Sequence, residues 1–286
     1  MESTNDEETQ RKSLSTRESQ ALSRLASENR QVISISDIAD ALDIPRKSAK
    51  DMAYALKEKG WLERIAHGKY LILPLAAGEN AVYTEHEFVI ASALVEPMYI
   101  GYWSALNHHG LTEQMSRTVY VVTTERAQER EIHGVTYRPV TVTEQKFFGY
   151  QPTAVGSNQV TISSIEKTLV DCADHPEFCG GISELAKAMQ NAVDTRCSWE
   201  RVVEYLRRVG NGAATKRLVY LADQLDIDLP EYRDLVENFT TGYPLLDPTR
   251  EATGTRDSNY QLRLNVDPES FLPIDFSQSS KRNYVD

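Results

Sequence analysis

Apolar residues recur at helical spacing near the start of the chain. Leu22 and Leu25 lie three residues apart, and Ser15 or Thr16 precedes them as a suitable N-cap. Polar residues occupy the positions between them, so only one face of this segment is apolar. The pattern predicts an amphipathic helix that ends near Asn29.

Two more helices are predicted on either side of a break at Asp43–Pro45. The first covers Ser36–Leu42, with Ser36 as the expected N-cap. The second covers Arg46–Lys59, and Pro45 suits its first position. The residues expected to face inward are Ile38, Ala39, Leu42, Ala49, Met52, Ala53 and Leu56.

A hairpin is predicted after the third helix. Trp61–Ile65 and Tyr70–Leu73 are rich in strand-forming residues, and Ala66–Lys69 provides the turn between them. A short apolar stretch at Val32–Ile33 lies between the first two helices. The order helix, short strand, helix, turn, helix, hairpin is that of a winged helix-turn-helix, and the segment IADALDIPRKSAKDMAYALKEKGWLERIAHGKYLI resembles regulators of that class.

The polar residues of this region suit duplex DNA. In a helix-turn-helix the second helix of the motif enters the major groove with its N-terminal residues. The hairpin turn would then reach the neighbouring backbone or minor groove. Tyr54 fits a packing role as well as a DNA contact. The predicted DNA-binding residues are Arg46, Lys47, Ser48 and Lys50 on the helix and His67 and Lys69 on the hairpin.

The remainder of the chain alternates between helical and strand patterns. The capping box Ser163-x-x-Glu166 is expected to begin the helix 165–174. Pro139 suggests a strand end. The predicted helices are 85–95, 102–110, 165–174, 182–192, 199–209, 213–224 and a helix within 225–241 that Pro230 breaks, and the predicted strands are 98–100, 118–123, 135–140, 159–162 and a late pair at 243–246 and 260–266.

These patterns predict an α+β protein: a winged helix-turn-helix followed by a mixed α/β domain. The expected boundaries are a disordered tail over residues 1–14, the DNA-binding domain over 15–75, the α/β domain over 79–268 and a polar tail over 269–286. Residues 74–80 read as the linker between the two domains.

Charge is distributed unevenly along the chain. The whole chain has a net charge of −11, yet residues 15–75 carry ten basic and eight acidic side chains. A local basic face can bind phosphates even when the whole chain is acidic. The chain has no apolar run long enough for a membrane span, and its acidic N-terminus does not resemble a secretory signal. A cytoplasmic protein is therefore expected.

Candidate catalytic and metal-binding groups are few. His108 and His109 are adjacent, so on a helix they point in different directions and are poorly placed to share a metal. Cys172 and Cys179 have no second cysteine pair. A metal-dependent nuclease could use Glu166 and Lys167 with Asp171, but the capping box explains Glu166, and solvent exposure is expected for Asp171. We predict no enzymatic activity, no cofactor and no metal.

Three segments of the second region resemble the AbiEi family, the antitoxins of type IV toxin–antitoxin systems. They are YIGYWSALNHHGLTEQ at Tyr99–Gln114, SSIEKTLVDCADHPEFCGG at Ser163–Gly181 and GYPLLDPT at Gly242–Thr249. The resemblance covers roughly residues 15–268. It implies a repressor that binds the DNA of its own operon. It also implies that the second domain counters a nucleotidyltransferase-like toxin without a stable complex. This chain departs from the family in the net negative charge of its second domain.

The same three segments also have a structural interpretation. Trp103, Leu106, Leu111, Ile165, Leu169 and Cys172 are expected in the core, and Gly110, Gly180 and Gly181 at turns and helix ends. Two alternatives to the antitoxin remain: a free-standing winged-helix regulator whose second domain senses a ligand or a protein, and an enzyme fused to a DNA-binding module. A neighbouring gene for a nucleotidyltransferase-like protein would distinguish the antitoxin from the free-standing regulator.

Overall fold

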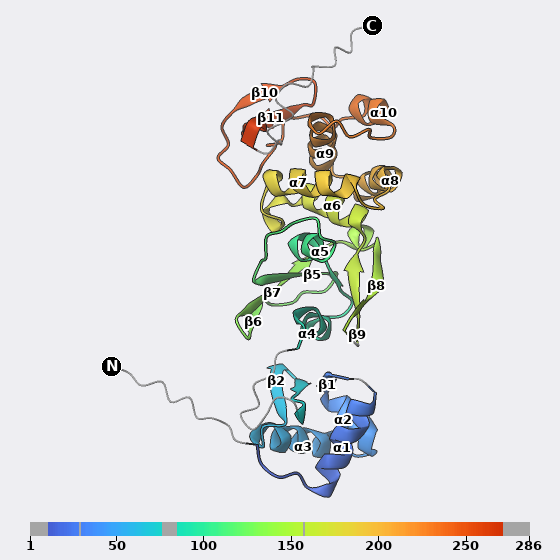
Figure 1. Cartoon of the computed structure of the whole chain (residues 1–286), viewed down its shortest axis with the longest axis vertical. Helices are drawn as coiled ribbons and strands as arrows, with labels where there is room; N and C mark the ends of the chain where they lie inside the picture. Colours follow the sequence, from blue (N-terminus) through green and yellow to red (C-terminus); the bar gives the residue numbers. More distant parts are fainter. Residues whose placement is uncertain (1–10, 29, 76–84, 157, 271–286) are drawn as a thin grey trace, which may run out of the picture. The chain divides into compact units, whose positions relative to one another are not determined.

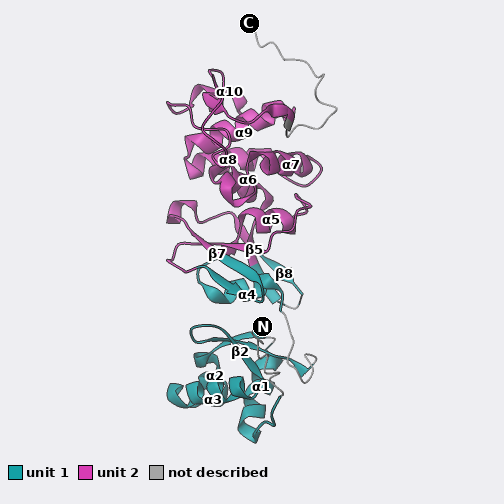
Figure 2. Cartoon of the chain, turned by 90° about the vertical axis from the view of Figure 1, so that its left-hand side faces the viewer, with its two compact units in different colours: residues 1–98, 129–137, 152–160 teal, residues 99–128, 138–151, 161–286 magenta. Residues whose placement is uncertain are grey.

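The computed structural model describes residues 11–28, 30–75, 85–156 and 158–270 of the chain. Helices and sheets both contribute, so the class is α+β as predicted (Figure 1). The chain divides into two compact units (Figure 2), of which unit 1 comprises residues 1–98, 129–137 and 152–160 and unit 2 the rest. Most of the predicted linker and of the predicted C-terminal tail lies outside the described residues.

The N-terminal region, residues 11–75 of unit 1, has three helices and a small sheet. The strands pair antiparallel in the order β1-β3-β2. This arrangement confirms the predicted helices and the predicted hairpin, and the three helices form a region like a helix-turn-helix. The elements are α1 (Thr16–Ser27), β1 (Val32–Ser34), α2 (Ile35–Leu42), α3 (Arg46–Glu58), β2 (Leu62–Ala66) and β3 (Lys69–Ile72).

Capping boxes begin the first two helices. Ser15 caps α1 as predicted, and its hydroxyl accepts a hydrogen bond from the backbone N–H of Glu18. The predicted cap of α2, Ser36, is wrong because Ser34 caps the helix together with Asp37. Asp37 lies three residues after Ser34, the spacing at which each side chain reaches the backbone N–H of the other residue. Pro45 is the N-cap residue of α3 and not its first helical residue.

The core of the N-terminal region is continuous from α1 to the hairpin. The positions predicted to face inward on α3 are buried, apart from the half-buried Met52. Residues 11–14 were expected in a disordered tail, but they lie against this region. The backbone N–H of Lys12 donates to the carbonyl of Lys59 at 3.0 Å. The indole N–H of Trp61 donates to the carbonyl of Lys12 at 2.8 Å. The fully buried side chains include Leu25, Ile33, Ile38, Ala49, Ala53, Leu56 and Leu71.

A six-stranded sheet has the order β6-β7-β5-β4-β9-β8. The predicted strands β4, β5, β7 and β9 are confirmed, whereas β6 and β8 lie in polar, exposed sequence that carried no strand signal. The members are β4 (Tyr99–Ile100), β5 (Thr118–Thr123), β6 (Arg130–Ile132), β7 (Val135–Thr141), β8 (Tyr150–Val155) and β9 (Asn158–Ser163).

Two predictions at strand ends are wrong. Pro139 lies within β7 and does not end it. The pairing of β6 with β7 reaches only Tyr137, so Pro139 lies past the last residue that β6 pairs with. The N-cap before helix 165–174 is Ser164, because Ser163 is still the last residue of β9. The predicted capping box at Ser163 is therefore not formed.

Helices make up most of unit 2 after β9. α6 is buried along almost its whole length and packs against α5, α7, α8 and α9. Of residues 225–241, only α10 is helical. Helix α4 (Glu87–Leu94) belongs to unit 1, and the helices of unit 2 are α5 (Tyr102–His108), α6 (Ile165–Asp174), α7 (Ile182–Val193), α8 (Trp199–Val209), α9 (Gly212–Gln224) and α10 (Tyr232–Glu237).

The late strand pair is shifted from its predicted position. β10 (Thr255–Asp257) pairs antiparallel with β11 (Leu262–Leu264). The segment 243–246, which was predicted to pair with the strand that contains β11, contributes a single bridge from Leu245 to Arg263. The side chain of Asn265 holds this segment by bonds to the backbone N–H and the carbonyl of Asp247. Backbone hydrogen bonds also join it to β11, from the N–H of Arg263 to the carbonyl of Pro244 at 2.8 Å and from the N–H of Leu246 to the carbonyl of Arg263 at 2.9 Å.

Candidate nucleic-acid interface

The first half of α3 exposes the predicted DNA-binding side chains. Arg46, Lys47, Ser48 and Lys50 are all exposed, whereas Ala49 among them is fully buried. Within the described part of the chain, none of the three basic residues forms an ion pair or a side-chain hydrogen bond. A helix with one face in the core therefore presents unpaired cations on the other face.

The start of α3 adds to this positive character. Pro45 gives the helix no side-chain cap, so the backbone N–H groups of the first turn are free of such a partner. The helix dipole places partial positive charge at the same end. Asp43, in a left-handed conformation, ends α2 and lets the chain turn sharply into α3. The tight break predicted at Asp43–Pro45 thus brings the basic residues to the exposed end of the helix.

The hairpin between β2 and β3 carries the other two predicted residues. His67 is exposed, and its Nδ1 lies 3.3 Å from a guanidinium nitrogen of Arg64. Lys69 is half-buried. Burial tends to raise the pKa of the nearby Asp37, but hydrogen bonds with Ser34 and, to a smaller degree, the charges of Arg30 and Lys69 outweigh it and lower this pKa. His67 is therefore presented to solvent at the tip, while Lys69 lies where β3 pairs with β1.

One exposed residue of α3 has a role that the sequence left open. Tyr54 is 64% exposed and lies outside the core cluster of the N-terminal region. The structure therefore does not support the packing role considered for it. The signal in the sequence was its position seven residues after Lys47 and four after Lys50, which places the three on one helix face.

Unit 2 buries several charged residues. On α6, Lys167 is fully buried and forms an ion pair with Asp171 one turn later. The hydroxyl of Tyr99 donates to Asp171 at 3.0 Å and accepts from Lys167 at 3.1 Å. Burial raises the pKa of Asp171 more than Lys167 and Tyr99 lower it. The predicted solvent exposure of Asp171 is thus wrong, because a cation on its own helix allows it to be buried.

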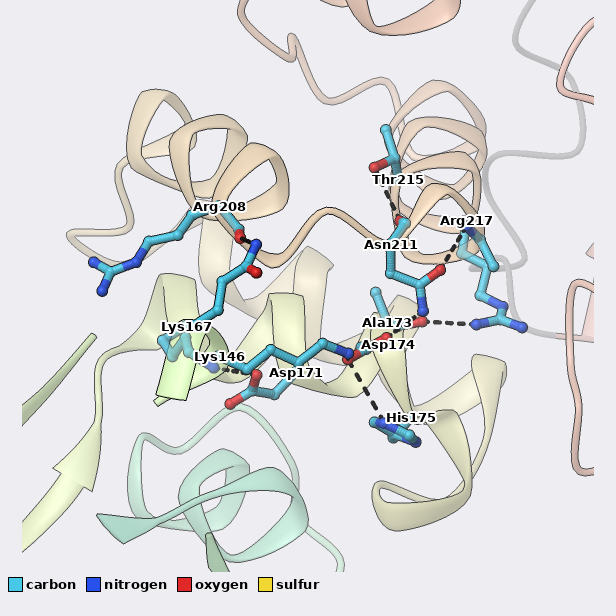
Figure 3. Close-up of polar contacts among 12 residues, drawn as sticks. Lys146, Lys167, Asp171, Ala173, Asp174, His175, Arg208, Asn211, Thr215 and Arg217 are labelled. Atoms are coloured by element: carbon cyan, nitrogen blue, oxygen red, sulfur yellow. Dashed lines mark hydrogen bonds and ion pairs between the residues drawn. The ribbon is translucent and has the colours of Figure 1, made fainter. Parts of the chain in front are cut away.

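A second acidic residue of α6 joins three elements. Asp174 bonds to Lys146, to the amide of Asn211 that caps α9, and lies 3.6 Å from the ring of His175 (Figure 3). The neighbouring Arg217 donates to the carbonyl of Ala173 at 2.9 Å (Figure 3) and to those of Leu245 and Leu246. These contacts hold the end of α6 against α9.

The glycine pair and the late segment GYPLLDPT meet at the start of α7. Gly181 supplies no side-chain cap for this helix, and Asp247 accepts the hydrogen bond from the backbone N–H of Ile182 at 3.1 Å instead. A Cβ on Gly181 would lie 2.8 Å from a carboxylate oxygen of Asp247, and one on Gly180 would lie 3.0 Å from the ring of Trp103. Both glycines have positive φ, so the two motifs interlock to build the fold.

The remaining candidate groups also bond within unit 2. A ring nitrogen of His109 lies 2.7 Å from the carbonyl of Ser163, and burial lowers the pKa of this ring. Glu166 is buried and accepts from the backbone N–H of Ser198, not from a capping box. Cys172 is buried as predicted. Among the residues that the structure describes, no group of three or more His, Cys, Asp or Glu side chains could hold a metal ion, and no helix is long and apolar enough to cross a membrane.

Comparison with known proteins identifies the N-terminal region. Residues 20–72, which contain α3 and the hairpin, match the model of a family described as transcriptional regulator, AbiEi antitoxin. Residues 20–72 are therefore similar to this family, and the match covers less than half of the chain. The match confirms the AbiEi resemblance over residues 20–72 and suggests a DNA-binding regulator, whereas the three segments of the second region that carried the resemblance lie outside it. No curated protein matches the chain.

One solved structure has a similar fold over most of the chain. The crystal structure of the RV2827C protein from Mycobacterium tuberculosis matches with a TM-score of 0.60 at 18% sequence identity. The match covers 87% of this chain and 92% of that chain. At this identity the similarity concerns the fold alone, and it extends well beyond the segment that matches the AbiEi family.

Proposed function

We propose that the chain is a DNA-binding antitoxin that represses its own toxin–antitoxin operon. The N-terminal region would act as a winged helix-turn-helix, with α3 in the major groove and the β2–β3 hairpin as the wing. The observation that carries the proposal is the exposed, unpaired set of basic residues on α3. Arg46, Lys47, Ser48 and Lys50 would contact phosphates and base edges, and His67 and Lys69 the adjacent backbone or minor groove.

The proposal includes a toxin that resembles a nucleotidyltransferase and is countered without a stable complex. Its support is the AbiEi family match, since AbiEi proteins are antitoxins as well as regulators. Unit 2 uses its motif residues in hydrogen bonds and packing of its own, which is compatible with a folded domain that acts without catalysis. The protein would work in the cytoplasm, where its operon and its toxin are.

DNA binding is tested by titrating labelled promoter DNA of the operon with the full-length protein at several salt concentrations. If three or four phosphates are neutralised, log affinity should fall against log salt with a slope of about −3 to −4. The variant Arg46→Ala/Lys50→Ala should lose most of the binding, because each charge-assisted contact contributes about 1–3 kcal/mol.

The matched control removes two exposed arginines outside the N-terminal region. Arg126→Ala/Arg196→Ala changes net charge equally and should bind DNA like the wild type. Equal binding by the α3 variant and the wild type, or an affinity that does not depend on salt, would show that α3 is not the DNA-binding helix.

The antitoxin role is tested with the same variants in cells. The toxin is expressed from an unrelated promoter, so that repression does not mimic neutralisation. The α3 variant should fail to repress a promoter reporter but still protect growth, because unit 2 is unaltered. A nanomolar complex between the two purified proteins in calorimetry would contradict the proposed mode of action.

A further inference from the structure

An aromatic side chain lies at the centre of the exposed face of α3. A helix advances about 100° per residue, so Tyr54 lies roughly 20° from Lys47 and 40° from Lys50 around the axis. The buried residues Ala49 and Leu56 lie about 140° and 160° from Tyr54 and face the core. Tyr54 thus belongs to the same surface as the basic residues that are proposed to contact DNA.

This tyrosine is exposed to an unusual degree for its size. It is 64% exposed, whereas Tyr243 and Tyr150 are 40% and 39% exposed. Within the described residues it forms no hydrogen bond and no stacked or edge contact with another ring. Tyrosine is enriched at binding surfaces because its side chain joins an apolar ring to a polar hydroxyl. Tyr54 lies outside the core of the N-terminal region, so substitution of Tyr54 should leave the fold intact.

The position of the ring along the helix suits a base contact. Tyr54 lies about 6 Å beyond Lys50 along the helix axis, at 1.5 Å per residue. The major groove admits a helix, and successive base pairs are about 3.4 Å apart, so residues one helical turn apart can meet neighbouring base pairs. A phenol ring offers an apolar surface, and the apolar group that base edges present in this groove is the C5 methyl of thymine.

We propose that Tyr54 determines specificity by contacting the methyl group of a thymine in the major groove, next to the base pairs that Lys50 reaches. This inference rests on the proposed function, because it requires α3 to enter the groove. The basic residues supply affinity through phosphates and guanine edges. Tyr54 adds discrimination at one position of the operator.

The site is first defined by selection from a duplex library with random positions. The full-length wild type should select one sequence motif, and Tyr54→Ala should select the same motif without its preference for thymine at one position. The affinity of Tyr54→Ala for the wild-type motif should fall by about tenfold. Met115→Ala, which truncates an exposed apolar side chain of unit 2, is the matched control and should behave like the wild type.

The contact is then tested by removing the methyl group. Each thymine of the selected site is replaced in turn by deoxyuridine, and one replacement should weaken wild-type binding by about fourfold. The same replacement should have no further effect on Tyr54→Ala. Tyr54→Phe should keep the thymine preference, since the ring and not the hydroxyl makes the contact.

Two results would overturn the inference while leaving DNA binding by α3 intact. One is an unchanged motif and affinity for Tyr54→Ala when Arg46→Ala/Lys50→Ala has lost binding. The other is a loss for Tyr54→Phe as large as for Tyr54→Ala with no response to any uracil, which would assign the hydroxyl to a phosphate. If the wild type selects no duplex at all, the proposed function fails together with the inference.

Discussion

The basic residues of α3 and those of α6 and α9 differ in what surrounds them. Lys47 and Lys50 are exposed and unpaired, whereas Lys167 and Lys216 are fully buried. Lys167 pairs with Asp171, and Lys216 donates to the carbonyls of Thr240 and Gly242. A buried cation needs such partners because desolvation is costly. The comparison separates cations available to a ligand from cations already used by the fold.

The carboxylates of the two regions show the same contrast. Burial tends to raise the pKa of Glu18, but hydrogen bonds from Lys59 and Ser15 outweigh it and lower this pKa. For Asp171 burial prevails, and the pKa is raised despite Lys167. Ionisation of Glu18 therefore stabilises the N-terminal region, whereas ionisation of Asp171 opposes the folded state of unit 2.

The largest expected effect follows from removing the buried cation of α6. Lys167→Met leaves Asp171 without its ion-pair partner inside the protein and should lower the free energy of unfolding by about 3–5 kcal/mol. Denaturant unfolding followed by circular dichroism measures it. Arg196→Met, which removes an exposed cation of the same unit, is the control and should change little.

A double variant sharpens this result. Lys167→Met/Asp171→Leu removes both charges and should recover much of the stability, because no unpaired charge remains. A loss below about 1 kcal/mol for Lys167→Met alone would mean that the pair is not buried as described.

The next effect concerns the cap that joins the two motifs of unit 2. Asp247→Ala removes the acceptor for the Ile182 N–H and for Thr249 and should destabilise unit 2 by about 1–2 kcal/mol. Thermal unfolding measures the change, with the exposed Asp228→Ala as control. Equal losses for both variants would contradict the capping role.

A smaller effect is expected in acid. Because the pKa of Glu18 is lowered on folding, its ionised carboxylate adds to the free energy of unfolding. This stabilisation is complete above pH 4.5, the ordinary pKa, and is lost as the pH falls through the lower pKa of the folded state. Glu18→Gln should reduce the acid-dependent loss of unfolding free energy by about 1 kcal/mol. Unfolding curves of both proteins, measured at pH 7 and below pH 4.5, test this difference. Identical pH profiles for variant and wild type would exclude the role of Glu18.

The smallest effect is expected where the cations are free. Arg46→Ala/Lys50→Ala should change the free energy of unfolding by less than about 0.5 kcal/mol, since neither side chain has a partner within the described residues. Denaturant unfolding checks this for the same preparation used in DNA binding. A large loss of stability would show that these residues support the fold, and the comparison with α6 would then fail.

Local signals predicted most of the regular structure. The N-terminal helices, the hairpin, strand Thr118–Thr123 and helix Trp199–Val209 follow from apolar periodicity and β-branched residues. The errors lie at positions where a more distant partner decides. Asp171 was expected in solvent because its sequence neighbours do not reveal that Tyr99 approaches from β4. β6 was missed because its residues are mostly polar and pair at the surface.

The sequence alone determined the amphipathic helices of the N-terminal region and the basic composition of α3, since these depend on residues a few positions apart. Only the tertiary structure decided which charged residues remain free. Lys47 and Lys167 are equally basic in the sequence, but one lies on an exposed helix face and the other among Tyr99, Phe148 and Asp171. The free energy of a charged group depends on the desolvation and the partners that packing imposes, and those partners come from segments far apart in the chain.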